Sequence, residues 1–152
     1  MVTGEDVLAA GEACHDFLRE AADADWIVPV PGLDHTVTSI LAHAANGPLW
    51  YAFDLWSGPS DAAFDLKVRS DASNAALLAS LRGAARVCAA SVGAAPPETR
   101  GFHPVGAADP SGFAAMACDE LLVHTDDAAR GLGLPFSPDR GLAGRVLGRL
   151  FP

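Results

Sequence analysis

The sequence predicts an all-α fold: an antiparallel four-helix bundle with an additional short C-terminal helix, in a single domain spanning residues 1–152. Three observations lead to this prediction. Apolar residues recur at helical spacing in four long segments, stretches rich in proline and glycine separate those segments, and no alternating apolar pattern is long enough to predict a strand. A chain of 152 residues, half of them hydrophobic, is also long enough to bury one core.

The first helix is expected to begin after an N-cap at Thr3 and to continue to about Asp23. Residues 26–33 contain two prolines, which fix the backbone and remove hydrogen-bond donors, so this segment should be an extended connection. Asp34 or Thr36 then caps the second helix.

Gly47 and Pro48 lie inside the second helical pattern, and we expect them to kink or break the helix before residues 50–56. A loop follows at residues 57–61. The pattern of residues 61–70 is ambiguous between helix and extended chain.

Asp71 or Ser73 starts the third helix, which the two prolines after Ala95 stop. A loop over residues 101–109 leads to Pro110, which suits the first turn of a fourth helix. The expected end of the fourth helix is 131–133, and the expected range of the fifth is about 139–150.

Charge and composition exclude several classes of partner. The net charge is −9 and the ten basic residues are scattered, so nucleic acid is not an expected partner. No run of eighteen apolar residues predicts a membrane span, and the acidic N-terminus lacks a signal-peptide core, so a cytoplasmic protein is expected. An acidic, alanine-rich bundle is compatible with a monomer or a homodimer.

Nine arginines against one lysine, together with 30 alanines, indicate the codon usage of a GC-rich genome such as an actinobacterium's. The three cysteines have no metal-type spacing and each lies in an alanine-rich helical stretch. We therefore expect small buried thiols and no disulfide framework.

The candidate metal ligands are His43, Glu120 and His124. Glu120 and His124 are four residues apart in an otherwise apolar helical run, so their side chains lie on one inward face. A buried carboxylate needs a partner, and His43 in a second apolar helix completes a set of two imidazoles and one carboxylate. Such a set leaves coordination positions open and suits zinc, although ferrous iron in oxygen chemistry also uses it. The simpler interpretations are a buried ion pair and a helix facing a cleft.

Three further residues belong to the predicted site. Asn46 and Trp50 follow His43 on the same helix and are candidates for binding a cofactor or thiol, with a core tryptophan and a helix-disrupting amide as the simpler interpretations. Asp127 is a candidate catalytic carboxylate and an acceptor for the His124 imidazole, or else a solvated helix end. His103, in a loop with proline and glycine, is expected at the surface.

Two blocks of sequence resemble a known family. Trp26-x-x-Pro-Val-Pro-Gly-Leu-x-x-Thr-Val, with Ile-Leu-Ala-His43 after it, is similar to the first half of the mycothiol-dependent maleylpyruvate isomerase-like N-terminal domain, a member of the DinB-like superfamily. The second half of that domain is similar to Phe102-His-Pro-x-Gly-x-x-Asp-Pro-Ser-Gly-Phe-x-x-Met-Ala-Cys-Asp-Glu120-Leu-Leu-Val-His124-Thr-x-Asp127. The resemblance covers most of residues 3–151.

The resemblance implies a DinB-like bundle in which His43, Glu120 and His124 hold a divalent metal, usually zinc, with nickel, manganese and iron left open. It also implies mycothiol as co-substrate, bound to the metal as a thiolate, and an electrophilic small molecule as its reaction partner. His35 stands where relatives often have tryptophan. The isomerase carries a further C-terminal domain that supplies substrate-binding groups. For this chain, thiol S-transfer is therefore expected in preference to isomerisation. The alternative is a non-catalytic, metal-stabilised domain that binds or senses a small molecule.

Overall fold

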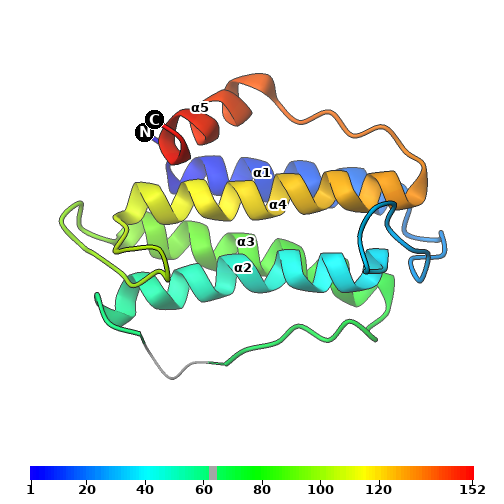
Figure 1. The fold of residues 1–152 in the computed structure, drawn as a ribbon, viewed down its shortest axis with the longest axis horizontal. Coiled ribbons are helices and arrows are strands. Elements are labelled where there is room, and N and C mark those ends of the chain that lie inside the picture. Colours follow the sequence, from blue (N-terminus) through cyan, green and yellow to red (C-terminus); the bar gives the residue numbers. More distant parts are fainter. Residues whose placement is uncertain (62–64) are drawn as a thin grey trace.

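The computed structural model describes residues 1–61 and 65–152. Every named secondary-structure element in these ranges is a helix. Four long helices form a bundle, and a short fifth helix packs against α4 (Figure 1). The only extended pairings among the described residues are two isolated bridges. The predicted all-α bundle is therefore confirmed. The helices are α1 (Gly4–Arg19), α2 (Val37–Ser57), α3 (Asn74–Ala94), α4 (Pro110–Leu132) and α5 (Arg140–Leu150).

In the bundle α1 and α4 run in one direction, and α2 and α3 run in the other (Figure 1). The starts of α1 and α4 meet where the Val2 N–H donates to the hydroxyl of Ser111 at 3.0 Å. The start of α3 meets the end of α1, because the Asn74 side chain donates to the carbonyls of Ala22 and Ala24. The start of α3 therefore lies at the opposite end of the bundle from the end of α2, and α2 packs between α3 and α4.

Side-chain caps define the starts of the helices as the sequence predicts. Thr36, and not Asp34, caps α2 in a reciprocal capping box with Ser39. Ser73 caps α3, and Asp109 caps α4 directly before Pro110.

The first helix ends at Arg19, four residues before the expected end at Asp23. The chain continues as tighter turns with bonds from residue i to i−3, and the buried Trp26 indole donates to the Ala21 carbonyl at 2.9 Å. The next segment is not simply extended, because the Val30 N–H bonds to the His35 carbonyl and closes a turn.

Of the kink or break expected at Gly47 and Pro48, the break does not occur. One continuous helix, α2, contains both residues, and both are buried. A proline removes only one backbone donor, and packing of the helix on both α3 and α4 outweighs that local cost.

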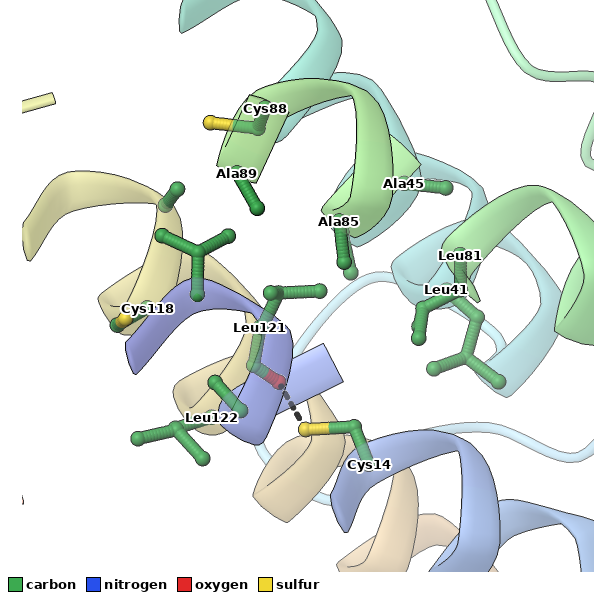
Figure 2. Close-up of a cluster of buried hydrophobic side chains, with 14 of the residues drawn as sticks. Cys14, Leu41, Ala45, Leu81, Ala85, Cys88, Ala89, Cys118, Leu121 and Leu122 are labelled. Carbon is green, nitrogen blue, oxygen red and sulfur yellow. Dashed lines mark hydrogen bonds between the residues drawn. The ribbon is translucent and has the colours of Figure 1, made fainter. Parts of the chain in front are cut away.

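All three cysteines are free and buried in the core, as predicted (Figure 2). The Cys14 thiol donates to the Leu121 carbonyl at 3.4 Å, which joins α1 to α4. Burial raises the pKa of each thiol to about 12, so none of them is a thiolate at neutral pH.

Among the described residues, one helix, α3, is long and apolar enough to cross a membrane by length and composition alone. Its apolar side packs against α1 and α2, and Leu77, Leu81 and Cys88 on that side are fully buried. The apolar composition of α3 is therefore explained by its packing in the core of the bundle.

Candidate metal centre

Helices α2 and α4 bring His43, Glu120 and His124 together, as the sequence predicts. One ligand atom from each side chain lies within 4.8 Å of the other two. Glu120 Oε2 is 3.4 Å from His43 Nε2 and 3.2 Å from His124 Nε2, and the two imidazole rings meet edge to face with centroids 5.0 Å apart. In the described part of the chain, no other group of three such donors converges in this way.

Glu120 reaches this position through a notch in α2. A β-carbon on Gly47 would lie 3.0 Å from the Cγ atom of Glu120 and 3.3 Å from its carboxyl carbon. His43 and Gly47 are one turn apart, so the missing side chain opens the helix face next to the first imidazole. Gly47 is thus the residue that admits the carboxylate between the helices.

The donor set fits a divalent cation. Donors bound about 2.0–2.1 Å from a tetrahedral zinc ion lie about 3.3 Å apart, which matches both Glu120–imidazole distances. Glu120 Oε2 is buried and receives no well-aligned hydrogen bond from the described residues, although both Nε2 atoms face it. An orphaned carboxylate oxygen between two ring nitrogens is a site that a cation would satisfy.

The centre is open on one side. The His43 side chain is 50% exposed, whereas the side chains of Glu120 and His124 are 23% and 22% exposed. Three protein donors with solvent access on one side are typical of a catalytic metal site, because a structural site is closed by four protein ligands.

Electrostatics in the described chain favour the charged forms of Glu120 and His124. Burial acts to raise the pKa of Glu120, but the nearby imidazoles of His124 and His43 and the Tyr51 hydroxyl outweigh it and hold the pKa of this carboxyl below its usual value. The close carboxylate of Glu120 raises the pKa of His124 in turn, with Asp127 adding to the effect. A bound cation would take the place of the proton on His124 Nε2.

Asp127 lies one turn beyond His124 on α4 and contacts the other side of the same imidazole. Its Oδ2 atom is 3.2 Å from His124 Nδ1, and its Oδ1 atom accepts from Arg130 at 3.1 Å. Arg130 also donates to the Pro31 carbonyl at 2.7 Å, so the carboxylate is held from the loop before α2. An imidazole that donates its Nδ1–H to Asp127 has its Nε2 lone pair available for a cation at this centre. The direct catalytic role expected of Asp127 stays a prediction.

Asn46 and Trp50 occupy different surroundings. The Asn46 Oδ1 atom accepts a hydrogen bond from the Val68 N–H at 2.6 Å, and the Trp50 indole donates to the Leu66 carbonyl at 3.0 Å. Both side chains therefore tie residues 66–68 to α2. The Trp50 ring nevertheless lies beside His43, with ring centroids 6.2 Å apart. Binding of a cofactor by Asn46 and Trp50 stays a prediction, and the position of Trp50 favours it more than that of Asn46.

Sequence reasoning missed Tyr51. Its hydroxyl donates to Glu120 Oε1 at 3.2 Å, on the side of the carboxylate away from the imidazoles. Burial, then the charge of Glu120, raises the pKa of Tyr51, so the phenol stays a donor. Its spacing of two helical turns from His43 was the available signal, since residues at i, i+4 and i+8 share one helix face.

A hollow of about 400 Å³ opens beside the centre, between α2 and the loop before α4. Tyr51 forms part of its wall, and the His103 ring stands 6.1 Å from the Tyr51 ring. His103, which was expected at the surface, is half-buried and lines this hollow.

Comparison with known proteins identifies one family. A family model described as "Mycothiol maleylpyruvate isomerase N-terminal domain" matches residues 7–129, which is more than half of the chain and includes all three candidate ligands. Neither the curated proteins nor the solved structures include a significant match.

Proposed function

The chain belongs to the mycothiol maleylpyruvate isomerase N-terminal domain family, and on that premise we propose that it is a metal-dependent, thiol-using enzyme of the S-transferase or isomerase class. The single observation that carries the proposal is the convergence of His43, Glu120 and His124 from two helices on one partly exposed point. Mycothiol is the proposed thiol because the family description names it.

The three side chains would hold a divalent cation, with zinc as the first candidate because two imidazoles and a carboxylate are ligands that it favours. When bound, the cation supplies a Lewis acid that lowers the pKa of a coordinated thiol. Glu120 contributes one negative charge to the ligand set, which leaves a net charge of +1 for a divalent ion. This residual charge favours an anionic fourth ligand such as a thiolate.

Residues around the centre orient its ligands and shape access to it. Asp127 fixes the ring of His124, and the Tyr51 hydroxyl holds the free oxygen of Glu120. The exposed face of His43 leaves the approach to the centre open from solvent. The three protein cysteines stay protonated in the core, so the reacting thiol must come from a small molecule.

Metal analysis combined with a thiol titration tests this proposal. Protein loaded with Co²⁺ should develop a thiolate-to-metal charge-transfer band when mycothiol is added, and glutathione serves as the comparison thiol. His124→Ala and Glu120→Gln should lose stoichiometric metal, whereas His35→Ala, an exposed histidine outside the centre, should keep it. Full metal retention by His124→Ala would overturn the proposed centre.

A turnover assay separates an enzyme from a binding or sensor domain. The metal-loaded protein with mycothiol should accelerate conjugation of a bimane-type electrophile, and the rate should disappear in His124→Ala. Thiol ligation without any acceleration, across a panel of electrophiles, would instead favour the non-catalytic alternative.

A further inference from the structure

We propose that the hollow between α2 and the loop over residues 101–106 is the pocket for the electrophilic partner, and that it takes a neutral or cationic aromatic compound in preference to a carboxylic acid. The identification of the ligand as an electrophilic substrate rests on the proposed function. The pocket and its selectivity do not depend on it.

The hollow adjoins the metal centre through two residues of α2. The Trp50 ring lies against His43, and the Tyr51 hydroxyl donates to Glu120, while both side chains also line the hollow. A compound held there would contact Trp50 and Tyr51, the two side chains that also contact the centre. A volume of about 400 Å³ is in the range of small-molecule sites and accommodates a single ring with its substituents.

The loop that forms the opposite wall is fixed tightly to α2. A β-carbon on Gly101 would lie 2.5 Å from the Asp54 carbonyl oxygen, so only glycine permits this approach. The Phe102 N–H donates to the Gly58 carbonyl at 2.9 Å, and two backbone bonds pair Gly101 with Ala108. These contacts hold Phe102 and His103 over α2, so this wall of the pocket is in place before any ligand binds.

Aromatic side chains make up much of the wall. Trp50, Tyr51 and Phe102 contribute rings from both sides, and all three residues are half-buried. The Trp50 N–H already bonds to Leu66, and the Tyr51 hydroxyl to Glu120, so both rings offer apolar surface to the hollow. Ring stacking is therefore the main interaction available to a ligand there.

The charge of the lining sets the preference among aromatic compounds. Asp54, Asp61 and Asp65 contribute three carboxylates, against a single imidazole from His103. Among the described residues no lysine or arginine lines the hollow, and the chain as a whole carries a net charge of −9. An anionic ligand is therefore repelled, and a cationic one attracted, by groups within a Debye length.

Titration of metal-free protein with three matched probes tests the inference, because a carboxylate probe could otherwise bind the metal. Benzamidine, benzamide and benzoate share a ring and differ in charge, and the Trp50 indole N–H signal reports on the hollow by ¹H–¹⁵N NMR. We expect benzoate to bind roughly tenfold more weakly than benzamidine, with benzamide between them. Equal affinities of benzoate and benzamidine would overturn the stated selectivity.

Variants separate the pocket from unspecific binding. Asp54→Asn combined with Asp65→Asn should reduce the benzamidine-to-benzoate ratio to roughly threefold. Asp34→Asn, a carboxylate at a different hollow, should leave the ratio unchanged. Phe102→Leu should weaken benzamide binding about threefold and Phe102→Ala about fivefold, and well-dispersed spectra would verify their folds.

Unchanged affinity for benzamide in both Phe102 variants would place the probes elsewhere and overturn the inference. Because these titrations use no metal and no thiol, their failure would leave the metal centre standing. Conversely, loss of the metal centre would leave the aromatic pocket standing without its assignment to an electrophile.

Discussion

Glu120 lies directly against Gly47, so that a β-carbon on the glycine would come within 3.0 Å of the Cγ atom of the glutamate. The contact joins α4 to the middle of α2 and sets the distance of the carboxylate from His43 and His124. The separation of the donor atoms thus depends on a residue that itself carries no ligand.

Gly47→Ala should weaken the metal site while leaving the fold intact. The added methyl group must displace the Glu120 side chain by a few tenths of an ångström, and we expect roughly a tenfold loss of zinc affinity from this misplacement. Gly83→Ala in α3 is the matched control, because nothing lies within 4 Å of its added carbon. That control should gain about 0.5–1 kcal/mol in unfolding free energy from helix propensity and keep its zinc affinity. Chelator-competition titrations measure the affinities, and equal values for the two variants would contradict this role of Gly47.

Asp127→Asn should reduce metal affinity by about 10–100-fold, because the carboxylate orients the ligating imidazole of His124 and makes it more basic. Asp126→Asn, at the neighbouring and exposed position, is the control and should bind zinc as the wild type does. Isothermal titration with zinc distinguishes the two variants. If Asp127→Asn keeps wild-type affinity but loses turnover, the carboxylate handles protons and does not position the ligand.

Periodicity predicted the helices and the pairing of Glu120 with His124, because both follow from local spacing. His43 was added because it is an imidazole in a second apolar helix that completes a metal-type ligand set, and the family resemblance supported it; nothing in local spacing relates α2 to α4. The break expected at Gly47 and Pro48 shows the opposite case: a rule on isolated helices failed where packing between helices decides the outcome.

The buried thiols should not react in the native protein. Burial raises the pKa of Cys14, Cys88 and Cys118 to about 12, so the thiolate that attacks a disulfide reagent is scarce, and access is blocked as well. Ellman's reagent should therefore detect none of them until denaturant is added, and all three afterwards. One rapidly reacting thiol per native chain would contradict the buried core and add a competing nucleophile to thiol assays.

Acid should weaken the attachment of α5 to the start of α1. Burial acts to raise the pKa of Asp6, but its bonds with Arg145 and Thr3 outweigh this and hold the pKa below its ordinary value. A carboxyl with a lowered folded-state pKa stabilises the fold above its unfolded value of about 3.9, and this contribution disappears as the pH falls through the folded-state pKa.

The test of this acid effect compares melting temperatures of the wild type and Arg145→Gln between neutral pH and about pH 2.5, a window that spans the unfolded carboxyl pKa. The wild type should melt at a higher temperature near neutral pH, and the difference should shrink below about pH 4. Arg69→Gln, whose partner Asp71 is exposed, should differ little from the wild type at any pH. A difference for Arg145→Gln that is constant with pH would exclude the Asp6 ion pair as its cause.

Tyr51→Phe should separate the support of Glu120 from the packing of the ring. The variant keeps the contact with Phe113, at a centroid distance of 6.0 Å, and loses the hydroxyl that donates to Glu120 at 3.2 Å. Without metal, the half-buried carboxylate loses a donor, so the free energy of unfolding should fall by about 1–2 kcal/mol. Zinc affinity should fall roughly tenfold, because the carboxylate is free to turn away from the imidazoles. Denaturant titrations with and without zinc measure both effects, and a variant unchanged in both would show that the tyrosine hydroxyl does not hold the ligand.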